Sequence, residues 1–443
     1  MKRLLLSAVA LLGLFAVTFA EEANSDWIIK GNVQTRSELD GTDFSDKTYA
    51  PISTSMRTRL SVAKTINSVK LFVQFSDSRL MGDTPGGTLG RGLNIDVHQA
   101  FVQMNGLFGM PMDLQVGRFE MKYGTERFIG PVGWHYVGRT FDGARAKFNL
   151  SDNFKLDAFT TLMRIDPDEG YKGNPNSKID RTGKTSNGSS LSGLWASIKA
   201  NKANKLDVFY YYELDRMDAG KNPAGDKVDV LSRSTIGASH WGNYGSISTI
   251  TEAAYQLGNA GGSDLAAYTA SLQIHYNFDD GSVGLGADLM SGTAWDANKD
   301  VKAGEVPVSN SYATSFGTNH KFYGYMDYFI SVDKNTANAG LNDFYLMFKY
   351  NLDDNLLFVT NIHQFTTNVE SVKDMKTDIG QEIDLSLKYT FSPSAKITFG
   401  QSVFLPGEWM KATYKQTDPT DATKVTRGED MAFWSYIMFQ ISM

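Results

Sequence analysis

Apolar and polar residues alternate in runs of roughly ten positions along almost the whole chain. In residues 56–64, for example, Arg57 and Arg59 fall on one face while Leu60 and Val62 fall on the other. Successive strand side chains point to opposite faces, so this period of two predicts strands with one apolar face. About eighteen such segments occur, at residues 27–39, 56–64, 69–76, 96–104, 114–117, 144–148, 154–163, 191–198, 206–214, 235–240, 247–256, 266–278, 283–290, 342–350, 357–364, 382–390, 396–404 and 431–443.

The connections between these segments alternate between short and long. Even-to-odd connections are short, as at residues 65–68, whereas odd-to-even connections are mostly long and polar, as at residues 167–190 and 291–341. One odd-to-even connection, 258–263, is shorter than this rule predicts. Outer-membrane barrels have short inner turns and long outer loops, while a sandwich or propeller has no reason to keep this asymmetry. The sequence therefore predicts an all-β fold, a single transmembrane antiparallel β-barrel over residues 21–443, with eighteen strands or alternatively sixteen.

The lipid bilayer determines which face of each strand points inward. In hydrocarbon every backbone polar group must be paired internally, so only a closed sheet can span. An Arg turned to the bilayer midplane costs roughly 2–4 kcal/mol, which fixes the register around Arg57 and Arg59. By the same argument Glu382 and Asp384 face the lumen and Leu385 faces lipid. A barrel of sixteen to eighteen strands is wide enough for an aqueous channel.

The first twenty residues have the features of a secretory signal peptide. Lys2 and Arg3 precede an apolar core at residues 4–17, and Thr18-Phe19-Ala20 fits a cleavage site. We therefore expect an exported chain in a Gram-negative outer membrane. Removal of Lys2 and Arg3 changes the formal charge from −6 to −8, because 41 basic and 49 acidic residues remain. With 42% hydrophobic residues, no Cys and no later long apolar run, the chain is neither disordered, nor a disulfide scaffold, nor helically anchored.

Groups that could support catalysis or metal binding are scattered. The six histidines show no metal-ligand spacing, and nothing places a serine beside a histidine as a barrel lipase would require. Glu382 and Asp384 could suggest a glycosidase pair, but two residues apart on one strand face they are better explained as lumen lining. We therefore expect no enzyme, cofactor or metal site, with a lipase, a glycosidase or an adhesive barrel as lesser alternatives.

Residues 114–148 form a strand, a loop dense in Arg, Glu and aromatic residues, and a second strand. Guanidinium groups attract and bind carboxylate, sulfate or phosphate solutes. Alternatively, Asp77, Glu126 and Asp142 pair with Arg79, Arg127 and Arg139 and hold an inward-folded loop. We favour pairing for Arg127, Arg139 and Asp142, and pore lining for Arg57, Arg59 and Arg145. In the longest loop, residues 319–327 either contact solute in the mouth or form loop core, and we favour the packed arrangement.

Several ordered motifs resemble the alginate-export family of outer-membrane barrels. They are VQFSDSR, HQAFVQM, VGRFEMKYGTERFIG, WHYVGRTFDGAR, HKFYGYMDYF and IGQEIDLSLKY, with the densest match between Arg57 and Phe148. The resemblance implies an eighteen-stranded barrel and a conduit for an anionic polysaccharide with an arginine-rich pore. It also implies the candidate pore residues Arg57, Arg59, Asp77, Arg79, Arg118, Arg127, Arg139, Asp142 and Arg145, to which the alternation adds Glu382 and Asp384.

The arginines are unevenly distributed, which changes the functional prediction. Nine of the fourteen arginines after residue 20 lie between Arg36 and Arg145, and only Arg427 follows Arg233. The later half offers acidic residues instead, which predicts a transverse field that orders polar solutes. We therefore favour a porin-like channel for polar or anionic small solutes or oligosaccharides over a dedicated exporter of a polysaccharide such as alginate. Expected partners are outer-membrane lipid and such solutes, with a periplasmic export partner as a further candidate and no nucleic acid; the oligomeric state is left open.

The arginine-rich wall predicts a channel that mildly prefers anions. The double substitution Arg57→Ala with Arg59→Ala should reduce this preference, since it removes two inward-facing cations. The measurement is the reversal potential in a salt gradient, and an unchanged ion ratio would count against a pore-lining role for these two side chains.

Overall fold

The fold is given by a computed structural model that describes residues 27–44, 49–81, 95–165, 188–215, 230–302, 305–418, 421–427 and 429–443. The expected signal peptide at residues 1–20 and most of the expected connection 167–190 lie outside these residues, as do residues 82–94 and parts of several other long loops. Among the described residues, no helix is long and apolar enough to cross a membrane.

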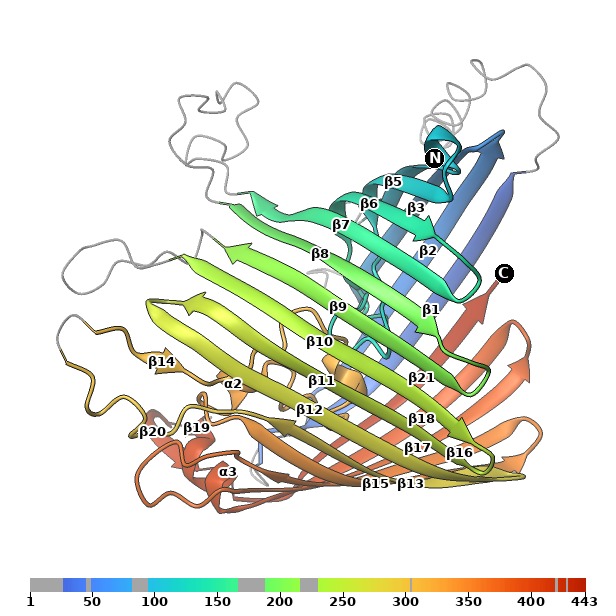
Figure 1. Ribbon diagram of the computed structural model, residues 1–443. Coiled ribbons are helices and arrows are strands. Elements are labelled where there is room, and N and C mark those ends of the chain that lie inside the picture. Colours follow the sequence, from blue (N-terminus) through green and yellow to red (C-terminus); the bar gives the residue numbers. More distant parts are fainter. Residues whose placement is uncertain are drawn as a thin grey trace, which may run out of the picture.

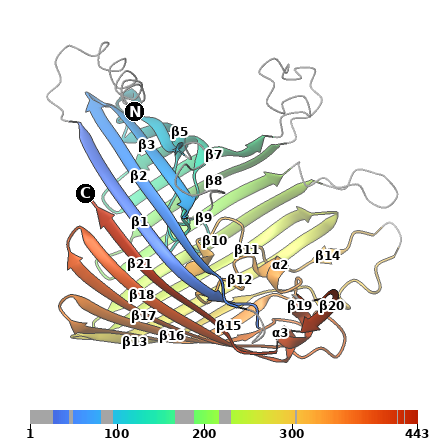
Figure 2. The same cartoon turned by 180° about the vertical axis from the view of Figure 1, so that it is seen from behind.

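Eighteen antiparallel strands, counted over the described residues, close into a barrel (Figures 1 and 2). Closure comes from β1, which pairs with β2 on one side and with the last strand, β21, on the other. The eighteen segments expected from the alternation overlap these strands one to one, so the eighteen-strand prediction is confirmed. The strands are β1 (Ile28–Gly41), β2 (Ile52–Ile66), β3 (Val69–Leu80), β4 (Ile95–Met104), β5 (Met112–Phe119), β6 (Phe141–Asn149), β7 (Phe154–Ile165), β8 (Gly188–Lys199), β9 (Asn204–Asp215), β10 (Leu231–Tyr244), β11 (Ile247–Ala260), β12 (Ser263–Phe278), β13 (Gly281–Met290), β15 (Leu341–Asp353), β16 (Leu356–Thr366), β17 (Asp378–Ser392), β18 (Ala395–Pro406) and β21 (Ala432–Ser442).

Small elements occupy the connections. The two-residue strand β14 (Val308–Ser309) pairs in parallel with the start of β12, and β19 (Lys415–Asp418) pairs with β20 (Asp421–Arg427) as a separate hairpin. The helical turns are short and belong to the connections: η1 (Leu107–Gly109), η3 (Asn319–Lys321), α2 (Val332–Asn335) and α3 (Glu408–Thr413).

The alternation places apolar side chains outward and polar ones inward, as expected. In β17 Glu382, Asp384 and Ser386 are buried inside the barrel, whereas Leu385 and Leu387 are exposed on its outer surface. The same holds on β2, where Arg57 is buried inside and Leu60 is exposed outside. A continuous outer surface of exposed apolar side chains on a closed sheet is what a lipid bilayer requires.

The expected asymmetry of the connections is also present. Short turns such as Asn67-Ser68 join strands at one end, the end where both termini of the sheet lie. At the other end the connections are long, except Gly261-Gly262 between β11 and β12, the short connection anticipated from sequence. Two of the long connections turn back into the barrel, at residues 120–140 and 311–331 (Figures 1 and 2). These two connections determine the shape and the lining of the lumen.

The outward register can be tested at Leu285 on β13, which is 66% exposed and pairs with the exposed apolar residues Ile274 and Leu346. Leu285→Arg should lower the free energy of unfolding in lipid vesicles by roughly 2–4 kcal/mol, because it turns a charge toward hydrocarbon. Leu285→Met is the matched control and should change stability little. Equal stability of the two variants would contradict this register.

Candidate functional site

Residues 120–140 and 311–331 interlock inside the barrel, and we call this pair of segments the plug. The amide of Gly130 donates to the carbonyl of Phe316 at 2.9 Å, and the amide of Thr318 donates to the carbonyl of Glu126 at 2.9 Å. The indole ring of Trp134 stacks on the imidazole of His320 with ring centroids 4.2 Å apart. The packed arrangement favoured for residues 319–327 is therefore the one found, and His320 also contacts Asp327 at 2.8 Å within the same loop.

The barrel wall binds one edge of the plug through backbone carbonyls. Each of the five carbonyl groups from residue 133 to residue 137 accepts a hydrogen bond from a side chain on β1, β2 or β3. Hydrogen bonds from charged donors are worth about 1.5–3 kcal/mol each. The donors are Arg36 to Trp134 (2.9 Å), Arg57 to Gly133 and His135 (both 3.0 Å), Arg59 to Val137 (3.0 Å) and Ser78 to Tyr136 (2.8 Å).

These contacts change the interpretation of Arg57 and Arg59. Arg57 is only 6% exposed, and its remaining hydrogen bond goes to the side chain of Gln34. Arg59 also forms an ion pair with Glu120 at 3.2 Å, and Glu120 contacts His98 at 2.7 Å. Both arginines do face the interior of the barrel, but the plug covers them. The geometry thus makes them anchors for the loop, and their contribution to ion preference stays a prediction.

Arg127 lies at the centre of the plug, with a side chain that is 2% exposed. Its guanidinium binds Glu252 on β11 at 2.9 Å and Asp288 on β13 at 3.0 Å, and it lies over the ring of Phe322. The predicted pairing of Arg127 with Glu126 is wrong. Glu126 has a left-handed backbone (φ 77°) and instead binds Lys122 at 3.0 Å and Lys321 at 2.7 Å. Burial alone would raise the pKa of Glu126, but hydrogen bonds from Lys321 and Lys122 outweigh it and lower the pKa.

Arg139 also departs from the expected pairing. It donates to the carbonyls of Gly130 and Gly317 at 3.2 and 3.1 Å, and to that of Phe316 between them. Burial lowers the pKa of Arg139 to about 10, so it remains charged near neutral pH. Its side chain therefore stabilises the turn of the neighbouring loop, and the carboxylate of Asp142 lies elsewhere.

Two of the predicted clusters lie on the outer surface of the barrel and not in the lumen. Arg118 binds Asp142 at 2.7 Å, and Arg79 binds Asp77 at 3.1 Å. The register shows this, because Arg57 is paired with Ser78, so the residues on either side of Ser78 point outward. These four residues therefore do not line the pore. The alternation contained the signal: Asp77 and Arg79 continue the apolar face of residues 71, 73 and 75, just beyond its end.

Arg145 does face the interior. It donates to the side-chain oxygen of Gln115 at 2.7 Å and lies 3.9 Å from the carboxylate of Asp157. Its guanidinium also lies over the ring of Phe119. Like Arg57 and Arg59, it is largely covered by its neighbours.

The acidic residues of the later strands are covered as well. Glu382 and Asp384 are both 0% exposed, and the backbone amides of Met326 and Tyr325 donate to them at 2.8 and 3.3 Å. Gly324 makes this approach possible, because a Cβ there would lie 2.4 Å from the carboxylate of Glu382. The expected acidic wall thus binds the plug and does not face solute, so a transverse field across open water is not what the structure provides.

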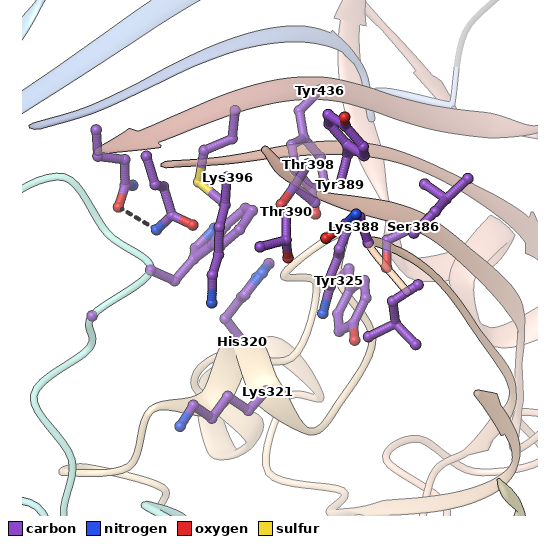
Figure 3. A pocket seen from close by; sticks show the side chains of 18 of the residues that line it. His320, Lys321, Tyr325, Ser386, Lys388, Tyr389, Thr390, Lys396, Thr398 and Tyr436 are labelled. Atoms are coloured by element: carbon purple, nitrogen blue, oxygen red, sulfur yellow. Dashed lines mark hydrogen bonds between the residues drawn. The ribbon is translucent and has the colours of Figure 1, made fainter. Parts of the chain in front are cut away.

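The accessible space lies between the plug and the short turns. A cavity of about 730 Å³ is bounded by the plug, by β16, β17, β18 and β21, and by the turn at residues 351–357 (Figure 3). Four lysines line it: Lys122, Lys321, Lys388 and Lys396. The two-residue period of β17 and β18 turns Lys388 and Lys396 inward, whereas the positions of Lys122 and Lys321 depend on how the two loops fold. Within the described chain no three His, Asp or Glu side chains converge as a metal site would require.

A family model for alginate export matches residues 32–423. The chain belongs to the alginate export family. A comparison with curated proteins gives no match. Several solved structures share the fold: OprD, an outer membrane protein from Pseudomonas aeruginosa (9% identity, TM-score 0.59, covering 94% of each chain), and OccAB4 from Acinetobacter baumannii (10%, 0.57, covering 96% of this chain and 99% of that one). A third is OpdK of Pseudomonas aeruginosa, solved with vanillate (12%, 0.56, covering 94% and 98%).

These findings confirm several expectations. The family is the one that the motifs indicated, and the fold is the expected eighteen-stranded barrel. Family and fold together assign this alginate export family protein to the outer membrane of a Gram-negative cell, with a porin-like architecture. At these sequence identities the solved structures are evidence for the fold alone.

The contacts of Arg127 predict what holds the plug in place. Arg127→Met should lower the free energy of unfolding by about 3–5 kcal/mol, because Glu252 and Asp288 would keep buried charges without a partner. It should also raise single-channel conductance and current noise, since the plug loses its central contact. Lys299→Met is the control, because Lys299 is 61% exposed and its ion pair with Asp296 at 3.6 Å is a surface contact worth about 0–1 kcal/mol. A wild-type conductance and stability for Arg127→Met would contradict this role.

Proposed function

We propose that the protein is an outer-membrane channel that passes small polar and anionic solutes through a lumen narrowed by the plug. The observation that carries the proposal is the accessibility of charge inside the barrel. Glu382, Asp384, Glu252 and Asp288 are buried against the plug, whereas Lys122 and Lys321 keep side chains that are 67% and 46% exposed. In the cavity beside the plug four lysines line the wall against the three carboxylates of Glu126, Asp353 and Asp354. Inward-facing cations in excess favour anions.

The arginines take part indirectly in this proposal. Arg57, Arg59, Arg127, Arg139 and Arg145 fix the plug and the wall around it, and so set the width and shape of the passage. We assign no catalytic step to the protein, and no cofactor.

A second candidate is export of an anionic polysaccharide, which the description of the family favours. It needs a passage wide enough for a sugar chain, so the plug would have to move or leave a continuous path. An acidic oligosaccharide and a neutral one of equal length separate the two candidates. An exporter should pass the acidic oligosaccharide, whereas a channel for small solutes should pass neither and should still pass vanillate, the carboxylate found with OpdK.

The test of the channel is its reversal potential in a tenfold KCl gradient across a planar bilayer. We expect a potential of the sign that marks chloride as the more permeant ion. Glu382→Gln should leave the ion ratio close to that of the wild type, because Glu382 is shielded from solute by Met326 and Gly324. A cation-preferring channel, or no conductance together with ester or glycoside hydrolysis, would overturn the proposal.

A further inference from the structure

The cavity between the plug and the short turns contains more positive charge than its own carboxylates balance. On the plug side, Lys122 and Lys321 share one carboxylate, that of Glu126, at 3.0 and 2.7 Å. Glu126 is only 3% exposed, whereas both lysines reach into solvent. This side of the cavity therefore has one positive charge in excess.

The barrel side of the cavity carries two further lysines on adjacent strands. Lys388 on β17 is in register with Thr398 on β18, and Thr390 is in register with Lys396. The two lysines are thus diagonal neighbours on the inner face, with Cα atoms about 7–8 Å apart. Neither has an ion-pair partner among the residues that the structure describes, and both are exposed. Lys349 on β15 adds a third cation on this face. Lys349 is in register with Val359 on β16, and Val359 is in register with the inward-facing Ser386 on β17.

Besides Glu126, two acidic residues line the cavity. Asp353 and Asp354 belong to the turn between β15 and β16, and no ion pair joins either of them to a lysine in the described chain. Like charges held side by side repel one another. A cluster of lysines on the inner wall with no bound carboxylate is therefore stabilised by any anion that enters.

The remaining lining indicates the kind of anion. Ser386, Thr390 and Thr398 supply hydroxyl groups beside the lysines, and the hydroxyl of Ser386 is buried with no hydrogen-bond partner in the described structure (Figure 3). The ring of Trp134 is already occupied, because the guanidinium of Arg36 lies 4.2 Å from its centroid and the imidazole of His320 stacks on it at 4.2 Å. Lysines with hydroxyls beside them suit an oxyanion, which accepts several charge-assisted hydrogen bonds.

The position of the cavity in the barrel indicates which side of the membrane it faces. Its walls run from the plug to the turn at residues 351–357, one of the short turns, and outer-membrane barrels keep their short turns in the periplasm. Resting on the channel function above, we propose that this cavity is a periplasm-facing site for an oxyanion group, a carboxylate, sulfate or phosphate, held between Lys388 and Lys396 on the wall and Lys321 and Lys122 on the plug. The site captures anionic groups on the inner side of the plug, before the narrow part of the lumen.

The sequence has no cysteine, so single reporter thiols can be introduced without background. In Thr390→Cys the thiol lies between the two wall lysines. Its rate of modification is measured with a negatively charged and a positively charged methanethiosulfonate of similar size. The negative reagent should react faster, and the ratio of rates should fall by about three-fold or more for each of Lys388→Gln and Lys396→Gln, as expected for a unit charge about 7 Å away in water.

The control is Lys147→Gln in the same Thr390→Cys background. Lys147 faces the lumen from β6 and donates to Gln103 at 3.2 Å, but it does not line the cavity. The rate ratio should stay unchanged in this variant, and heat-modifiable gel mobility shows that each variant is folded. An equal rate for the two reagents in the parent, or an equal fall in the ratio with Lys147→Gln, would overturn the site.

Binding and sidedness are tested with inorganic sulfate and with an acidic trisaccharide. Either probe should slow modification of Thr390→Cys and should block current when added from the periplasmic side, with a weaker effect from the outer side. A second reporter, Asn355→Cys in the short turn, reveals the orientation of each inserted channel through a membrane-impermeant thiol reagent. If only sulfate protects the thiol and blocks current, the site binds free ions. If the trisaccharide does so at a lower concentration than sulfate, the site binds charged groups on a chain.

Protection that is equal from both sides, or absent with both probes, contradicts a periplasm-facing site. These results are independent of the channel function. An anion-preferring channel without protection would overturn the site alone. A cation-preferring reversal potential would overturn the proposed function, while the modification rates would still report whether the cavity is positive.

Discussion

A loop that folds into the lumen of a barrel must find hydrogen-bond partners for its backbone, and in this protein the wall arginines supply them. The turn at residues 133–137 pairs with no neighbouring strand, so its five consecutive carbonyls would be left with poor partners. Arg36, Arg57, Arg59 and Ser78 bind all five. The long, planar guanidinium suits this task because it reaches across the lumen and donates several hydrogen bonds in a fixed geometry.

The same constraint explains the distribution of charge. The acidic residues on strands β11 to β17 bind the plug. Glu252 and Asp288 form ion pairs with Arg127, while Glu382 and Asp384 accept hydrogen bonds from backbone amides. Buried charges are tolerated when they are paired and hydrogen-bonded. Arginines on the early strands and carboxylates on the later ones therefore bind opposite sides of one plug. The accessible surface that remains near the short turns is rich in lysine, and this imbalance gives the lumen its chemistry.

This arrangement separates two roles that an inward-facing arginine can have. A guanidinium whose hydrogen bonds go to carbonyls positions the passage, whereas an amine without a bound carboxylate is available to solute. Arg139, with its carbonyl partners and buried side chain, belongs to the first group. Lys388 and Lys396 belong to the second. Counting arginines in a family of this kind therefore does not by itself describe the surface that a solute meets.

The sequence by itself determined the barrel, its strands and the direction of most side chains, because the two-residue period and the cost of charge in lipid act locally on every strand. The inward positions of Arg57, Glu382 and Lys388 follow from that period alone, and so does the outward position of Asp77 and Arg79, which extend an apolar face. Only the tertiary structure decided the partners. Arg127 meets Glu252, 125 residues away, and Arg139 meets carbonyls more than 170 residues away, because two loops fold together in the lumen. No local rule relates such distant segments, so the plug, the shielding of the acidic wall and the lysine-lined cavity appear only when the barrel has closed around them.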